Sequence, residues 1–342
     1  MRRKQQLARL LGASGGLRLL DAYWGADRLT VLAYHRVMEV HPRAFAPNIS
    51  ATPALFDAEM AFVSQHFNVI GLPTLQAHLT HHTPLPPRPL LITFDDGYRD
   101  VYTNAFPILK KHGLPAVVFV VTSRMDNPAP LWWDVCAHTF HDTERTQANL
   151  PLVGQQSLST TAERHTARDA FIEQAKRLPH AQKETAIASL QSTLGTPQPP
   201  AEPLFVDWGQ LREMGEHGVV AQPHTVDHPI LTRIPIAEAH QQLAVSGDAV
   251  QAQTGQAPIA FAYPNGGHND YNTQIIEALQ QLDYRVAFTL RPGPMRAHHL
   301  ACHPFEIRRI FLSHRDTLEI FKMKVMGLPA LLSRLSYHGE AC

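Results

Sequence analysis

Two adjacent carboxylates, Asp95 and Asp96, directly follow an apolar run and have the types and spacing to do chemistry. The run, residues 90–94, is short and bounded by a proline-rich segment and by Gly97, which is typical of a buried strand. Because a buried, unpaired carboxylate is costly, we expect both aspartates at the strand end, in a cleft or on a metal ion. One could hold a cation while the other stays free as a base. Alternatively, the pair caps the helix predicted over residues 99–112, since aspartate is a favoured N-cap residue.

A second pair of candidate ligands, His224 and His228, lies far downstream and follows the apolar run at residues 218–221. Two histidines at this spacing can converge on one cation when the loop between them turns back. One aspartate with two histidines is a common ligand set that leaves coordination positions open for water and substrate. In a chain with 21 histidines the pair alone is weak evidence. Combined with the aspartates, it predicts a metal centre.

Three motifs of this chain resemble those of the polysaccharide deacetylases, carbohydrate esterase family 4. TFDDGY at residues 93–98 and HTVDH at residues 224–228 resemble the first two motifs, and FAYPNGG at residues 261–267 is similar to the third. The resemblance covers residues 29–312. It implies a metal-dependent hydrolase that removes an N-acetyl group from an amino sugar in a polysaccharide or glycan, which would be its partner.

The resemblance also implies roles for individual residues. Asp95 would be the catalytic base. Asp96, His224 and His228 would hold one divalent metal ion, with Zn²⁺ as the expected ion. Cobalt, nickel and iron suit the same ligands.

The third motif departs from the family pattern at two positions. Asn265 stands where the family often has tyrosine, but its backbone N–H remains able to bind an oxyanion, so Asn265 and Tyr263 are the candidate oxyanion and substrate residues. Ala262 stands where many members have an arginine that orients the base. We expect Arg308 or Arg309, in the last predicted strand, to supply this guanidinium, with Arg309 as the candidate catalytic residue.

His35 is the candidate general acid. It follows residues 29–34, the first predicted strand, and the carboxyl ends of barrel strands line active sites. Related deacetylases tend to carry a Tyr-His pair here. The alternative is a loop histidine bonded to nearby backbone.

The expected fold is a distorted (β/α) barrel of about seven parallel strands, as the resemblance implies. The alternation of strands and helices alone indicates only a mostly parallel α/β fold. The barrel would occupy residues 29–312, between helical segments at residues 1–28 and 313–342. Residues 124–203 break the alternation and are predicted as a helical insertion. Its paired tryptophans, residues 132–133, could either pack in a core or stack on a sugar.

Composition narrows the functional classes. The 342 residues are 44% apolar and 18% charged, which is typical of a soluble globular protein. A formal net charge of zero gives no reason to expect nucleic acid as a partner. Three cysteines without CxxC spacing indicate neither a disulfide framework nor a thiolate zinc site. Arginines and glycines interrupt the leucine-rich residues 1–28, so we expect no signal peptide or membrane span, and a cytoplasmic protein or one with peripheral membrane contact.

Two other functions fit the same motifs. One is hydrolysis of a different non-peptide C–N bond, such as that of a small amide. The other is a catalytically inactive carbohydrate-binding relative, although binding alone does not need a free base such as Asp95 beside three ligands. A glycosidase also uses two carboxylates, but it needs no histidine pair.

Overall fold

The computed structural model describes residues 27–40, 49–125, 127, 129–197 and 202–328. Nearly all of the predicted N-terminal helical segment and the end of the C-terminal one lie outside these residues. Among the described residues, no helix combines the length and the apolar character that crossing a membrane requires.

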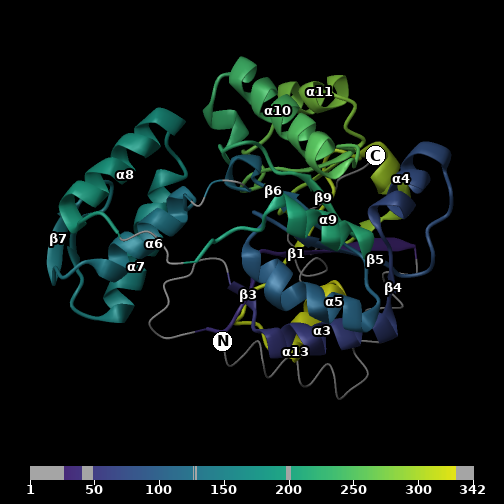
Figure 1. The fold of residues 1–342 in the computed structure, drawn as a ribbon, viewed down its shortest axis with the longest axis horizontal. Helices are drawn as coiled ribbons and strands as arrows, with labels where there is room; N and C mark the ends of the chain where they lie inside the picture. The colour runs from purple at the N-terminus through teal and green to yellow at the C-terminus, as the bar shows by residue number, and fades with distance from the viewer. Residues whose placement is uncertain (1–26, 41–48, 126, 128, 198–201, 329–342) are drawn as a thin grey trace.

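A seven-stranded sheet forms the centre of the fold (Figure 1). All of its ladders are parallel except the one between β12 and β1. The strands are β12 (Met295–Arg296), β1 (Arg28–Tyr34), β5 (Pro89–Phe94), β6 (Ala116–Val120) and β9 (Val219–Pro223), with β13 (Ile310–Phe311) on β1 and β4 (Asn68–Val69) on β5. Every residue of β1, β5 and β6 is buried, which explains their continuous apolar sequences.

The parallel strands continue around a distorted barrel. A second parallel ladder joins β10 (Ala260–Ala262) to β11 (Val286–Phe288). A bridge from Phe288 to Ile307 then leads into β13, which returns to β1. The parallel order is therefore β1, β5, β6, β9, β10, β11 and β13, and the expected architecture of about seven parallel strands is confirmed.

The barrel has a seam between β9 and β10, where the described residues form no ladder. The side chain of Gln222 bridges this seam. Its Nε2 donates to the carbonyl of Ala257 at 3.0 Å, and its Oε1 accepts from the N–H of Ala260 at 2.8 Å. An amide side chain thus takes over the backbone pairing that keeps the third motif beside the histidine motif.

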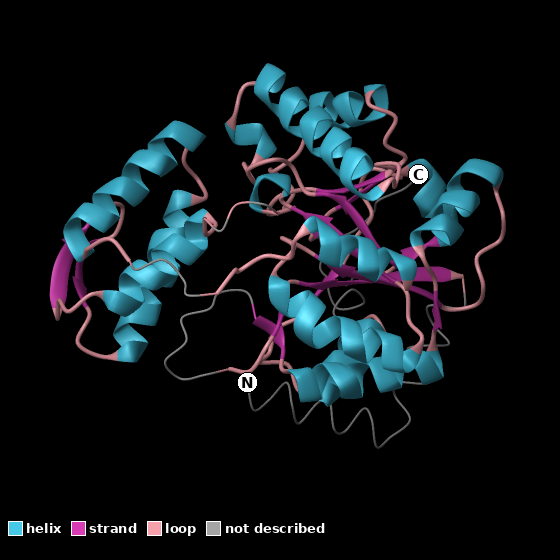
Figure 2. Cartoon of the chain, in the orientation of Figure 1, coloured by secondary structure: helices cyan, strands magenta, loops and turns pink. Residues whose placement is uncertain are grey.

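Helices lie on both sides of the strands (Figure 2). They are α3 (Pro53–His66), α4 (Leu72–His81), α5 (Phe106–His112), α9 (Trp208–Glu216), α10 (Ile236–Thr254), α11 (Thr273–Gln281), α12 (Ala297–Cys302) and α13 (Leu318–Val325). The helix expected over residues 99–112 begins as a π-helical turn, η1 (Val101–Ala105), before α5. Pro107 has no N–H to continue an α-helical ladder, so a wider turn precedes it.

The insertion forms a separate lobe beside the barrel, drawn in teal in Figure 1. It contains α6 (Trp132–Asp142), α7 (Thr161–Ala175) and α8 (His180–Leu194) around an apolar core of its own. A hairpin of β7 (Gln147–Leu150) and β8 (Gly154–Ser157) also belongs to it, which the sequence pattern did not predict. These strands are rich in polar residues, so their sequence lacks the apolar run used to find the barrel strands.

Candidate active site and metal centre

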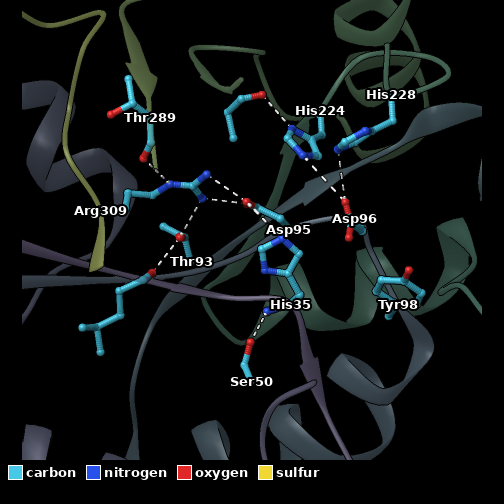
Figure 3. Close-up of polar contacts among 12 residues, drawn as sticks. His35, Ser50, Thr93, Asp95, Asp96, Tyr98, His224, His228, Thr289 and Arg309 are labelled. Atoms are coloured by element: carbon cyan, nitrogen blue, oxygen red, sulfur yellow. Dashed lines mark hydrogen bonds and ion pairs between the residues drawn. The ribbon is translucent and has the colours of Figure 1, made fainter. Parts of the chain in front are cut away.

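Three loops at the carboxyl ends of parallel strands bring the predicted residues together (Figure 3). Asp95 and Asp96 follow β5, His224 follows β9, and the third motif begins in β10 and continues into the loop after it. Because parallel strands end on the same rim, residues far apart in the sequence meet there. The aspartates do not cap the following helix, since the residue that precedes η1 is Asp100.

Asp96, His224 and His228 form a buried group that could hold a metal ion. The Asp96 Oδ1 atom lies 3.7 Å from His224 Nε2 and 3.5 Å from His228 Nε2. Ligands of a tetrahedral zinc ion with bonds of ~2.0–2.1 Å are about 3.3–3.5 Å apart, so these side chains need little movement. Within the described residues, both Asp96 carboxylate oxygens are buried and accept no hydrogen bond. Two unsatisfied carboxylate oxygens facing two imidazoles fit a cation.

The protonation states of these residues also suit a cation. Burial, reinforced by the charge of Asp95, holds the pKa of Asp96 well above its usual range, so its ionised form needs a nearby positive charge. Burial lowers the pKa of both His224 and His228, which leaves neutral rings with a free lone pair. The carbonyl of Ala262 accepts a 2.6 Å hydrogen bond from His224 Nδ1, which directs the Nε2 lone pair toward Asp96.

The backbone of these loops is strained. Four non-glycine residues of the three loops have positive φ: Asp96 at 73°, Thr225 at 69°, His228 at 58° and Asn265 at 64°. Such conformations cost ~1–3 kcal/mol each and persist where the surrounding structure enforces them, often at functional sites. Here the Thr225 hydroxyl accepts from the N–H of His228 at 2.9 Å. The fold therefore imposes the geometry of the ligand loop.

Asp95 points away from the ligand group and forms a bidentate salt bridge with Arg309. Arg309 Nη1 donates to Oδ1 at 2.6 Å and Nη2 donates to Oδ2 at 2.8 Å. The guanidinium is fully buried and is also bonded to Thr93 Oγ1 and the carbonyl of Thr289. Burial raises the pKa of Asp95, but Arg309, together with His224 and His35, outweighs burial, so the pKa lies below its usual value. Of the two arginines considered, Arg309 is thus the one that reaches Asp95 and keeps it ionised.

His35 lies on the same rim, with Nε2 4.0 Å from Asp95 Oδ2. Its backbone N–H donates to Ser50 Oγ at 2.8 Å, and its ring packs edge-on against Phe311. Burial lowers the pKa of His35 to about 4, so the ring is neutral at pH 7. A neutral imidazole is not an acid in the resting site, but it can take up a proton and pass it on.

The two residues predicted from the third motif are placed differently. Asn265 Nδ2 donates to Asp270 Oδ2 at 2.6 Å, which holds the turn, while its backbone N–H has no partner among the described residues. Tyr263 is fully buried, stacks on Tyr271 and donates its hydroxyl to the carbonyl of Phe305. Since its side chain belongs to the core, we do not carry Tyr263 into the site.

Sequence reasoning missed a cluster beside the candidate metal ligands. The hydroxyl of Tyr98 lies between Trp133 Nε1, at 2.7 Å, and the Asp134 carboxylate, at 2.9 Å. Trp133 is buried, so its ring is not a surface for sugar stacking. Two features of the sequence could have indicated this cluster: the aromatic residue that ends TFDDGY and the Trp-Asp pair at the start of α6.

Comparisons with known proteins concern the family and the fold of this chain. The model of the polysaccharide deacetylase family matches residues 82–287. The putative polysaccharide deacetylase YxkH of Bacillus subtilis (strain 168) is 20% identical over 267 residues, which is 78% of this chain and 66% of that protein. The poly-beta-1,6-N-acetyl-D-glucosamine N-deacetylase of Escherichia coli (strain K12) is 24% identical over 244 residues. That match covers 71% of this chain but only 30% of the relative.

Solved structures show the same fold. The Streptococcus pyogenes deacetylase PplD, in complex with acetate, matches with a TM-score of 0.59 and 19% identity over 87% of this chain and 98% of that one. IcaB from Ammonifex degensii matches with a TM-score of 0.57 and 19% identity over 88% of this chain and 98% of that one.

Proposed function

Because this chain belongs to the polysaccharide deacetylase family, we propose that it hydrolyses N-acetyl groups on amino sugars, with N-acetylglucosamine polymers as the substrate class. The names of its relatives support this substrate. The observation that carries the proposal is that the two adjacent aspartates have different partners. Asp96 faces two histidines, while Asp95 is held ionised and apart from them by Arg309.

Asp96, His224 and His228 are the proposed ligands of one divalent ion, for which we propose zinc because their oxygen and nitrogen atoms are ligands that zinc accepts. When bound, the ion would polarise the acetyl carbonyl and lower the pKa of water.

Asp95 is the proposed general base. Its two oxygens each accept one hydrogen bond from Arg309 and keep lone pairs for the proton of the attacking water. Arg309 fixes the orientation of the carboxylate and favours its ionised form. General base catalysis of this kind contributes ~10²–10⁴-fold to a rate.

His35 and Asn265 complete the proposed site. The neutral His35 ring would take up the proton near Asp95 and deliver it to the amine as the C–N bond breaks, so that acetate and a free amino sugar result. The N–H of Asn265 is the proposed donor to the oxyanion. Location in the cytoplasm and peripheral membrane contact remain predictions from the sequence.

The test of this function is acetate release. Metal-loaded protein is incubated with β-1,6-linked and β-1,4-linked N-acetylglucosamine oligomers, and acetate and new amines are quantified. Equal amounts of both products from at least one oligomer are expected, and Asp95→Asn serves as the control. Oligomer binding without either product would favour the inactive carbohydrate-binding relative, and release of ammonia from small amides alone would favour the other C–N hydrolase.

A further inference from the structure

The two histidines of the candidate metal centre are held in different ways. His224 is oriented by the hydrogen bond from its Nδ1 to the carbonyl of Ala262. The Nδ1 atom of His228 has no hydrogen bond to another residue in the described part of the chain. Apart from an interaction with its own backbone, the His228 ring therefore depends on packing for its orientation.

His228 packs against Trp133, which comes from the insertion rather than from the barrel. The two ring centroids are 4.6 Å apart and the rings are nearly perpendicular, at 72°. The His228 ring also contacts His224, with the two ring centroids 4.7 Å apart. His228 is thus packed against both its fellow ligand and the first turn of α6.

The position of Trp133 is in turn fixed by a chain of hydrogen bonds in which the donor and the acceptor of each bond can be assigned. An indole nitrogen only donates, so the Tyr98 oxygen accepts from Trp133 Nε1 at 2.7 Å. The Tyr98 hydroxyl proton must then go to the Asp134 carboxylate, whose oxygens lie 2.9 and 3.1 Å away. Asp134 also accepts from the N–H of Leu131, which anchors it to the start of α6.

The barrel holds the other side of Tyr98. The guanidinium carbon of Arg36 lies 4.4 Å from the centre of the Tyr98 ring, within cation–π range. Arg36 Nε is bonded to Asp100 Oδ2 at 2.8 Å. Tyr98 therefore has a fixed ring plane, two directional hydrogen bonds and full burial, which are the properties of a positioning element.

We propose that Trp133 is a positioning residue for the metal ligand His228 through its ring contact, and that Asp134 holds Trp133 in place through the hydroxyl of Tyr98. In this arrangement the insertion completes the metal centre of the barrel, although none of its described residues belongs to the candidate ligand group. The inference rests on the metal centre of the proposed function. It assigns to the Trp-Asp pair that opens α6 a role in metal affinity rather than in sugar stacking.

The test measures metal binding directly, without substrate. The affinities of Zn²⁺ and Co²⁺ are determined by chelator competition, and the visible spectrum of bound Co²⁺ reports the ligand geometry. Tyr98→Phe and Trp133→Phe should each weaken binding about 10-fold or more and change the Co²⁺ spectrum, as losses around metal ligands typically do. Asp134→Asn keeps an acceptor for Tyr98 and should stay close to wild type, while Asp134→Ala should behave like Tyr98→Phe.

Tyr284→Phe is the matched control, because Tyr284 is also buried and donates its hydroxyl to a protein acceptor, the carbonyl of Leu243 at 3.0 Å. It should lose a comparable amount of thermal stability and keep wild-type metal affinity. Unchanged affinity and an unchanged Co²⁺ spectrum in folded Tyr98→Phe and Trp133→Phe would overturn this inference alone. A wild-type protein that binds neither ion would overturn the metal centre as well.

Discussion

Asp95 and Arg309 are 214 positions apart in the sequence and share two buried hydrogen bonds of 2.6 and 2.8 Å. The topology brings them together. Strand β1 lies between β5, which leads into Asp95, and β13, which follows Arg309. The N–H of Asp95 also donates to the last carbonyl of β1, at Tyr34. The orientation of the proposed base is therefore set by the pairing of β1 with both β5 and β13.

Arg309→Lys should impair the base while keeping a positive charge. Lysine lacks the planar guanidinium group that donates a hydrogen bond to each carboxylate oxygen. Because Arg309 lowers the pKa of Asp95, weakening this contact should raise that pKa and move the acidic limb of the kcat/KM profile to higher pH. Arg308→Lys, at the neighbouring position, should leave the limb in place. An unchanged profile for Arg309→Lys would show that this arginine does not tune the base.

Asp95→Asn and Asp96→Asn should fail in different ways. Asp95→Asn keeps the shape of the side chain but removes its basicity, so it should retain the metal and lose ~10²–10⁴-fold in kcat. Asp96→Asn should weaken metal binding, and added metal should partly restore activity. Metal content measured together with kcat separates the two. The opposite pattern would mean that the roles are exchanged.

Glu59 should make stability depend on pH. Burial raises its pKa from 4.5 to about 8, while the hydrogen bond from Tyr34 opposes the rise. Above pH 4.5 the unfolded chain ionises Glu59 and the folded protein does not, so stability should fall as pH rises toward 8 and then level off.

The size of this effect follows from the pKa difference. Relative to Glu59→Gln, the wild-type free energy of unfolding should decrease by on the order of a few kcal/mol between about pH 5 and pH 8. The measurement is urea unfolding across this range. Glu213→Gln is the control, because Glu213 is also bonded to a tyrosine, Tyr102, but is exposed. Parallel curves for wild type and Glu59→Gln would contradict the burial of a protonated carboxyl.

Gln222→Leu should open the seam of the barrel. It removes the side-chain partner of the buried Ala260 N–H, and a buried group left unsatisfied costs ~1–3 kcal/mol, whereas the exposed Ala257 carbonyl still accepts from the N–H of Ile259. The free energy of unfolding from urea titration should fall accordingly. Gln251→Leu, on the exposed face of α10, should change it by less than ~0.5 kcal/mol. An equal effect of both substitutions would show that Gln222 does not bridge β9 and β10.

The sequence predicted the parts of the fold that rest on local signals. Apolar runs predicted β1, β5 and β6, and the aspartate motif TFDDGY together with the histidine motif HTVDH predicted which side chains share a rim. The role of Gln222 could not be predicted from a local signal, because it depends on the absence of a backbone ladder between β9 and β10 in the described residues. The hairpin of β7 and β8 was missed because its residues are mostly polar.

The rest of the site depends on contacts between distant segments. From the sequence, the arginine that contacts Asp95 could be either Arg308 or Arg309. A strand this short does not indicate which of two adjacent side chains points inward. The packing of Trp133 on His228 joins the insertion to the barrel, and no local pattern encodes it. Tyr263 belongs to a motif beside the site, yet its side chain points into the core, because motif membership does not specify orientation.

The most direct test of the account is metal-dependent acetate release by one preparation of the protein. Metal is removed by a chelator, and one equivalent of Zn²⁺ is added back in the presence of N-acetylglucosamine oligomers. We expect no acetate from the stripped protein, full recovery at one equivalent, and no recovery in His224→Ala at the same metal concentration. Acetate release that persists in the stripped protein, or that His224→Ala retains in full, would contradict a metal centre formed by Asp96, His224 and His228.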